Sequence, residues 1–192
     1  MKTHLGFLAI GALMLLTGST TALAADTYKI DSVHTYVVFK VNHLGMTNNY
    51  GRFNDISGKI VFDDKDPSKS SIDIEIQAAS IDTANQKRDD HLRGPDFFNA
   101  KQFPVIAFKS KSVKKTGANT FDITGDLTMH GVTKPLSFVF TKTGEGKDPW
   151  GNNRAGGEAT FTIKRSDFGM TYSIGPSGDE VTLLVSVEAL KQ

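Results

Sequence analysis

Histidines are the residues of this sequence best suited to acid-base chemistry or metal binding, and four follow residue 24: His34, His43, His91 and His130. His34 and His43 are nine residues apart, an odd separation that puts them on opposite faces of a straight strand. A carboxylate of Asp89 or Asp90 could orient the imidazole of His91, but no motif ties a nucleophile to this segment. We interpret the histidines as hydrogen-bonded residues at turns and strand ends, although separate segments could still converge on a metal.

Common catalytic and metal-binding motifs are missing. The sequence has no H-E-x-x-H, G-x-S-x-G, G-x-x-x-x-G-K-[ST] or G-x-G-x-x-G, and it has no cysteine for thiolate chemistry or iron-sulfur clusters. Part of an EF-hand spacing is present at Asp64, Asp66, Ser68 and Glu75. However, Lys69 stands where the loop needs glycine and Pro67 interrupts it. The sequence therefore predicts no catalytic residue, no metal site and no cofactor.

Composition indicates an ordinary folded domain. The chain has 192 residues, 22 Lys+Arg against 21 Asp+Glu, and 39% hydrophobic residues. This near-zero net charge creates no long-range field that would attract nucleic acid or an anionic membrane surface. We expect one domain that binds no nucleic acid and does not insert stably into a membrane.

The first 24 residues read as a secretory signal peptide rather than as part of the domain. Lys2 and His4 precede an apolar run over residues 5–16, and Ala22-Leu23-Ala24 forms an A-x-A cleavage pattern. The run is too short to span a bilayer, which takes roughly 20 residues, so an uncleaved anchor is the weaker alternative. We predict a signal peptide over residues 1–24 and an exported domain over residues 25–192.

Strict alternation of apolar and polar residues dominates the exported part, and this is the period of a β-strand. It is clearest where Ile72, Ile74 and Ile76 alternate with polar neighbours. We predict eight strands, around residues 33–41, 51–62, 72–77, 105–108, 121–129, 136–140, 159–163 and 181–188. A glycine-rich loop is expected over residues 144–157, and His130-Gly131 is expected to be a tight turn.

One short helix is predicted over residues 85–92, because this polar stretch lacks β-branched residues and ends at Gly94-Pro95. Lys87, Arg88 and Arg93 lie on or beside it and could meet an anionic headgroup, but a solvated surface is the default interpretation. Trp150, in the predicted glycine-rich loop, is either a lid over a pocket or a loop anchor.

The predicted architecture is all-β. Eight antiparallel strands with one apolar face each can form a sandwich or close into a barrel whose interior holds side chains or one small ligand. Twelve of the 13 phenylalanines follow the signal peptide. They could fill the core or line a cavity, in which ten buried ligand carbons would contribute roughly 8 kcal/mol before association costs.

The sequence resembles the YceI-like family of polyisoprenoid-binding proteins over residues 28–190. The segments that carry the resemblance are Tyr28-x-Ile30-Asp31-x-x-His34-Thr35, Val37-x-Phe39-x-Val41-x-His43-Leu44-Gly45, Gly51-Arg52-Phe53, Arg88-Asp89-x-His91-Leu92, Asp96-Phe97-Phe98, Phe103-Pro104, Gly125-Asp126-Leu127-Thr128-Met129-His130-Gly131-Val132-Thr133-Lys134 and Arg165-Ser166-Asp167-Phe168-Gly169. The resemblance implies a lipocalin-like, eight-stranded antiparallel barrel with a short helix, an apolar interior and no enzymatic activity. It also implies export to the periplasm, a link to stress responses, pairing as a homodimer, and a place for the four histidines in the pocket or at the barrel rim.

The resulting hypothesis is a periplasmic protein that sequesters or carries a long-chain isoprenoid, such as an isoprenoid quinone or a polyprenyl phosphate, or another amphiphilic lipid. The residues expected to contact the chain are Val37, Phe39, Val41, Ile74, Ile76, Phe108, Phe121, Ile123, Met129, Phe138, Phe140 and Phe161. Arg88, His91 and Arg93 are the headgroup candidates. Two alternatives remain: an enzyme acting on a lipid or its phosphate, with a compact cluster of His, Asp and a hydroxyl, and a structural protein whose barrel is solid.

Overall fold

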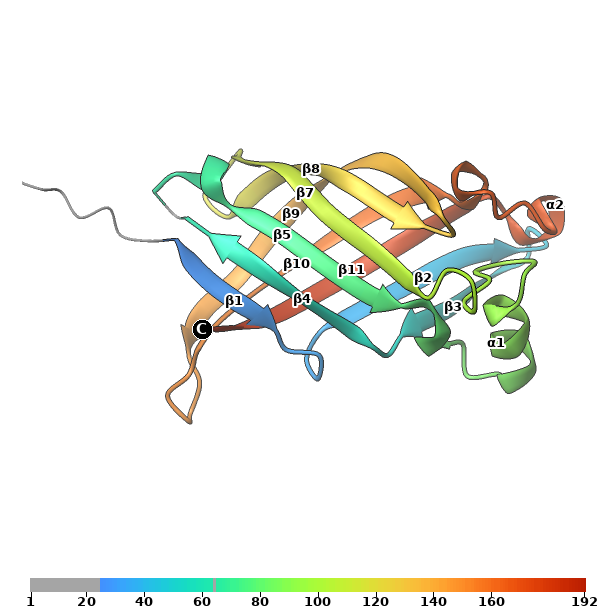
Figure 1. Ribbon diagram of the computed structural model, residues 1–192, viewed down its shortest axis with the longest axis horizontal. Coiled ribbons are helices and arrows are strands. Elements are labelled where there is room, and N and C mark those ends of the chain that lie inside the picture. The colour runs from blue at the N-terminus through green and yellow to red at the C-terminus, as the bar shows by residue number, and fades with distance from the viewer. Residues whose placement is uncertain (1–24, 64) are drawn as a thin grey trace, which may run out of the picture.

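The computed structural model describes residues 25–63 and 65–192 (Figure 1). The predicted signal peptide and Asp64 of the EF-hand-like spacing lie outside the described residues. The strands are β1 (Asp26–Ile30), β2 (Tyr36–His43), β3 (Thr47–Phe53), β4 (Ile56–Phe62), β5 (Ser71–Gln77), β6 (Ile81–Asp82), β7 (Val105–Lys115), β8 (Thr120–Met129), β9 (Val132–Lys147), β10 (Asn153–Lys164) and β11 (Glu180–Lys191). The chain also forms two short helices, α1 (Gln86–Arg93) and α2 (Ile174–Ser177). In addition it has three 3-10 turns, η1 (Pro67–Lys69), η2 (Ala78–Ser80) and η3 (Arg165–Phe168).

The strands close into an antiparallel barrel. The hydrogen-bonded order β1-β4-β5-β7-β8-β9-β10-β11 returns to its start because β1 also pairs with β11. β2, β3 and β6 then continue three of these strands toward one end. β2 follows β1 along β11, β3 pairs with β2 as β4 pairs with β1, and β6 pairs with β3 as β5 pairs with β4. Eleven segments therefore build the eight-stranded barrel that the alternation and the resemblance predicted.

Two details of the sequence prediction are wrong. Val33 and Thr35 do not belong to the first strand, because residues 31–35 form a break between β1, which was not predicted, and β2. Residues 144–157 are not a loop, since β9 and β10 run through them and only residues 148–152 connect the two strands. Glycine weakens an isolated strand, but here the paired neighbour supplies the backbone hydrogen bonds. The structure also adds α2 to the single predicted helix.

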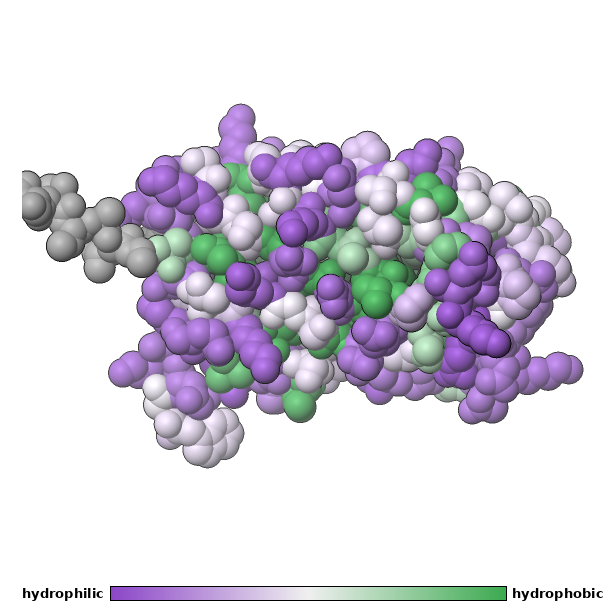
Figure 2. Space-filling model, in the orientation of Figure 1, coloured by the Kyte–Doolittle hydropathy of each residue, from purple (hydrophilic) through white to green (hydrophobic). Residues whose placement is uncertain are grey.

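Several local predictions agree with the structure. The predicted helix is α1, capped by the Asn85 side chain, which accepts a hydrogen bond from the Arg88 backbone N–H. The turn at His130 and Gly131 is tight, with both residues at positive φ and Met129 paired directly with Val132. Figure 2 shows the outer surface of one face, on which hydrophilic side chains are prominent and a group of apolar side chains lies near the middle.

The break at residues 31–35 is held by a cluster of ion pairs. Arg154 Nη1 lies 2.6 Å from Asp31 Oδ2 and 2.6 Å from Glu188 Oε1, and its Nε lies 2.7 Å from Asp148 Oδ2. Asp31, His34 and Glu188 also place possible metal-ligand atoms within 4.8 Å of one another. Because the Arg154 guanidinium already forms ion pairs with two of these carboxylates, we interpret the cluster as a structural tie between β10, β11 and the break.

The Asp31 carboxylate makes the stability of the barrel depend on acidity. Its pKa is lowered from 3.8 to about 2, first by the hydrogen bond to His34 and then by that to Arg154. A lowered folded-state pKa stabilises the fold above pH 3.8, and this contribution is lost as the pH falls toward 2. We expect Asp31→Asn to lower the melting temperature near neutral pH and to flatten its decline below pH 4.

Thermal unfolding followed by circular dichroism across this pH range tests the expectation. Asp122→Asn, which changes an exposed side chain on β8, is the matched control and should keep the pH profile of the unchanged protein. Parallel curves for Asp31→Asn and the unchanged protein would rule out this role for Asp31.

Candidate functional site

A cavity of about 440 Å³ lies inside the barrel and is lined mainly by apolar side chains. An apolar cavity of roughly 150 Å³ can stay dry and bind benzene, so this one has room for a much larger ligand. It lies within the about 300–1,000 Å³ typical of small-molecule sites. A solid barrel, one of the alternatives, is therefore inconsistent with the structure.

Most of the candidate binding residues lie on the wall of this large cavity. They are Val37, Phe39, Val41, Ile74, Ile76, Arg88, His91, Phe108, Met129, Phe138, Phe140 and Phe161. The strand residues among them occupy the faces that the alternation assigned to the interior. Their contact with a ligand stays a prediction.

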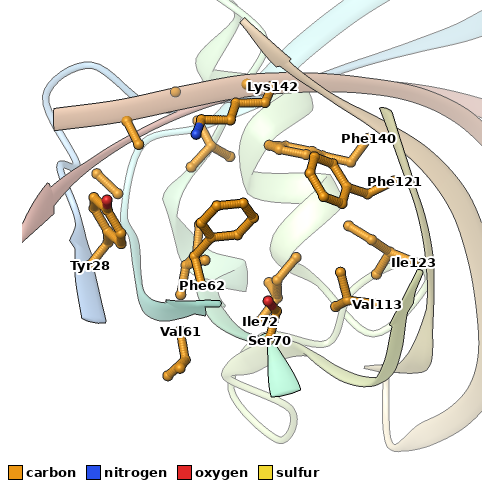
Figure 3. Close-up of a pocket in the computed structure, with 16 residues that line it drawn as sticks. Tyr28, Val61, Phe62, Ser70, Ile72, Val113, Phe121, Ile123, Phe140 and Lys142 are labelled. Carbon is orange, nitrogen blue, oxygen red and sulfur yellow. The ribbon is translucent and has the colours of Figure 1, made fainter. Parts of the chain in front are cut away.

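Phe121 and Ile123 lie instead on the wall of a second cavity of about 70 Å³ (Figure 3). Phe140 faces both cavities, as do Ile60, Ile72 and Val187, so the two spaces are adjacent along the barrel. In Figure 3 the Phe62 ring stands in the middle of the small cavity, with Tyr28 and Lys142 near its edge. A chain filling the large cavity therefore needs no contact with Phe121.

Packed rings and charged groups line the small cavity. The rings of Phe62 and Phe121 meet edge to face with centroids 5.7 Å apart, and the Lys142 ammonium lies 4.8 Å from the Phe62 centroid. Burial, followed by the charge of Glu145, raises the pKa of Tyr28 to about 12. The protonated phenol donates a 3.4 Å hydrogen bond to Glu145.

Phenylalanine rings on the wall of the large cavity pack closely over glycines of neighbouring strands. A β-carbon added to Gly51 would lie 2.3 Å from the Phe39 ring, and one added to Gly125 would lie 2.6 Å from the Phe108 ring. Phe138 stacks on Phe161 with centroids 4.8 Å apart and an interplanar angle of 21°. Rings held against the wall leave the centre of the barrel empty.

Arg93 lies on neither cavity wall. Its guanidinium donates to the backbone oxygens of Ala79 at 2.7 Å and Ile81 at 2.8 Å, and it pairs with Asp90 at 3.0 Å. These bonds attach α1 to the segment around β6. The structure therefore gives Arg93 a positioning role rather than the headgroup contact that the sequence predicted.

Asp89, one of the two carboxylates that could have oriented His91, is not bonded to it. This side chain is 5% exposed and accepts hydrogen bonds from the Thr83 N–H at 2.9 Å and hydroxyl at 2.5 Å. His91 instead bonds Asp96 at 2.9 Å. Asp89 thus fixes the loop before α1, and Asp96 orients His91 at the cavity wall. Trp150 is 80% exposed and lines neither cavity, so it is not a lid over either of them.

The polar part of the large cavity lies near α1 and α2, which share one end of the barrel in Figure 1. There the rings of His91, Phe97 and Tyr172 form a triangle with centroid distances of 5.1 to 5.4 Å. Arg165 lies beside it, with its guanidinium carbon 5.8 Å from the Phe97 centroid. The sequence reasoning missed Arg165, Phe97 and Tyr172 as site residues, and its one signal for Arg165 was the family-like segment over residues 165–169.

The chemistry of the cavity wall favours binding over catalysis. Its polar residues are His43, Asn49, Thr83, Arg88, His91, Arg165, Tyr172, Ser173 and Ser177. Within the described part of the chain, neither cavity wall contains an aspartate or a glutamate. His91 on the wall of the large cavity pairs with Asp96, but no hydrogen bond joins its ring to a hydroxyl group among the described residues.

A closed antiparallel barrel around an apolar cavity with one polar end defines a lipocalin-like, ligand-binding class of fold. Residues 28–189 match the YceI-like domain, and the chain belongs to the YceI-like family. It is 46% identical to a UPF0312 protein of Yersinia pestis over 99% of this chain and 97% of that one. It is 44% identical to a UPF0312 protein of Pseudomonas aeruginosa over the full length of both.

Solved structures show the same fold. The YceI protein of Campylobacter jejuni is 30% identical, with a TM-score of 0.71 over 95% of this chain and 99% of that one. BcnA of Burkholderia cenocepacia has a TM-score of 0.76 at 24% identity, covering 83% of this chain and 99% of its own. A polyisoprenoid binding domain from Saccharophagus degradans has a TM-score of 0.69 at 15% identity, covering 88% and 100%.

Membrane-spanning helices are absent from residues 25–63 and 65–192, where every helix is too short or too polar to cross a bilayer.

Proposed function

We propose that this protein binds a long-chain isoprenoid lipid inside its barrel and sequesters or transports it without covalent chemistry. The apolar cavity of about 440 Å³ carries the proposal. Each ligand CH₂ removed from water contributes about 0.8 kcal/mol, so chain length rather than a single contact would supply most of the affinity. The domain of similar fold from Saccharophagus degradans is a polyisoprenoid binding domain, which supports the same class of ligand for this protein.

The proposed setting is the periplasm. The signal-peptide pattern over residues 1–24 supports export, and a lipid with a long apolar chain needs a protein carrier to cross an aqueous compartment. A homodimer, which the family resemblance implies, stays a prediction. Sedimentation velocity of the purified protein with and without lipid would measure it.

The test of the proposed function is to identify what the protein carries when it is purified from its export compartment. We expect native mass spectrometry to show a discrete adduct, and organic extraction to release a compound of isoprenoid mass. Delipidated protein should take up a geranylgeranyl chain from solution with one-to-one stoichiometry. A clean apo mass under gentle ionisation, together with no uptake by the delipidated protein, would contradict the proposal.

A further inference from the structure

Arg165 is a buried cation with an unused hydrogen-bond donor at the cavity wall. Its side chain is 6% exposed, and its Nη2 is the one buried side-chain nitrogen or oxygen without a hydrogen-bond partner among residues 25–63 and 65–192. Nε donates to the Gly178 backbone oxygen at 2.8 Å, and Nη1 donates to those of Tyr172 at 2.8 Å and Met170 at 3.2 Å. These three bonds fix the guanidinium plane and leave Nη2 free.

The charge of Arg165 has no direct carboxylate partner. Asp179 acts on it electrostatically, but the Asp179 carboxylate accepts from the Ser166 N–H at 2.9 Å and hydroxyl at 2.8 Å. No ion pair within 4.0 Å involves Arg165 in the described part of the chain. Burial lowers the pKa of Arg165 although the charge of Asp179 opposes this shift, and a buried charge without a hydrogen-bonded counter-ion is costly.

A second guanidinium lies on the cavity wall at this end of the barrel. Arg88 also lines the wall, on the same face of α1 as His91, which is three residues further on. Arg88 donates to the Thr83 hydroxyl and carbonyl oxygens at 2.7 Å each, so it too lacks a carboxylate bond among its described contacts. The rest of the cavity is apolar and suits a hydrocarbon chain.

We propose that Arg165 is the headgroup-binding residue and that the cavity selects an apolar chain ending in an anionic oxygen group, such as a phosphate. The inference rests on the proposed function, because it assigns one end of the same ligand. An anionic headgroup would satisfy Nη2, neutralise the buried guanidinium and leave the chain in the apolar part of the barrel. A neutral alcohol or quinone could at most accept a hydrogen bond from Nη2, and the charge of the Arg165 guanidinium would stay unpaired.

The test compares two ligands with the same chain. Delipidated protein is titrated calorimetrically with geranylgeranyl phosphate and with geranylgeraniol. Hydrogen bonds to charged groups contribute about 1.5–3 kcal/mol, so we expect the phosphate to bind about tenfold tighter or more. Inorganic phosphate alone, in large excess, should neither bind measurably nor displace the lipid phosphate, because it lacks the chain.

Three variants assign the preference to one residue. Arg165→Gln should remove the preference while keeping geranylgeraniol binding, which also shows that the barrel is folded. Arg165→Lys keeps the charge and should therefore retain part of the preference. It provides a second test in case Arg165→Gln disturbs the fold. Arg52→Gln, which removes the same charge from an exposed position on β3, should behave like the unchanged protein.

The possible results distinguish the assignment of Arg165 from the proposed lipid binding. Equal affinity of the unchanged protein for the two lipids, or a preference that survives Arg165→Gln, would overturn the assignment of Arg165 while lipid binding stands. Failure of both lipids to bind the unchanged protein would overturn the proposed function, and the headgroup inference with it. A preference of about tenfold or more that Arg165→Gln abolishes and Arg52→Gln keeps would establish the inference.

Discussion

Phe138→Trp is expected to weaken the binding of a geranylgeranyl chain by about tenfold to a hundredfold. Phe138 lines the large cavity and is held on two sides by other rings, with centroids 5.4 Å from Phe108 and 4.8 Å from Phe161. The larger indole therefore has to extend into the open centre of the barrel. If it excludes two or three chain carbons, about 2 kcal/mol of apolar burial is lost, which corresponds to about thirtyfold in affinity.

The matched control is Phe121→Trp. This variant makes the same change of side chain in the small cavity. A ligand chain in the large cavity does not need to contact that space. Calorimetric titration of both delipidated variants with geranylgeraniol should show a large loss for Phe138→Trp and little change for Phe121→Trp. Unchanged affinity in both variants would refute the assignment of the large cavity as the binding site. A loss only in Phe121→Trp would move the site to the small cavity.

Gly157→Ala is expected to reduce the free energy of unfolding by about 1–3 kcal/mol, the usual cost of overpacking a filled interior. The new β-carbon would lie 2.3 Å from the Phe140 ring and 2.6 Å from the Thr141 backbone oxygen. The ring and the backbone must both shift, so the strain cannot be relieved by one side chain. Denaturant unfolding followed by circular dichroism measures the change.

Gly144→Ala is the control for this substitution. Gly144 lies on β9, and a β-carbon there would have no atom within 4 Å. Alanine is favoured over glycine in a strand by roughly 0.5–1 kcal/mol, so Gly144→Ala should leave stability unchanged or raise it. If the two variants proved equally stable, the close packing of phenylalanine on glycine would not be what shapes the cavity wall.

The faces of the strands followed from local sequence. Val37, Phe39 and Val41 share a face because side chains alternate along a strand, and the structure puts all three on the cavity wall. The same rule applies to Ile74, Ile76 and the phenylalanines of β9. The glycine-rich region over residues 144–157 was mispredicted because glycine lowers strand propensity, and local propensity does not include the neighbouring strand that supplies the ladder.

The polar end of the site depended on geometry that local patterns do not contain. Arg93 and Arg88 are close in sequence, yet one is bonded to the backbone of the segment around β6 and the other faces the cavity. Arg165 reaches the wall because the 3-10 turn after β10 folds it against three carbonyl groups near α2. Such contacts join residues 5 to 13 positions apart through turns, where no periodic pattern operates.

The sequence by itself determined that eight strands would alternate between a wet and a dry face, because the two-residue period of an extended chain is a local property. It also determined family membership, through segments in a common order along the chain. Only the tertiary structure decided that the barrel is hollow, since that depends on how side chains of neighbouring strands meet, as Phe39 does over Gly51 and Phe108 over Gly125. The division into two cavities and the position of Arg165 were likewise set by strand register and turn geometry, which bring together residues that are distant in the sequence.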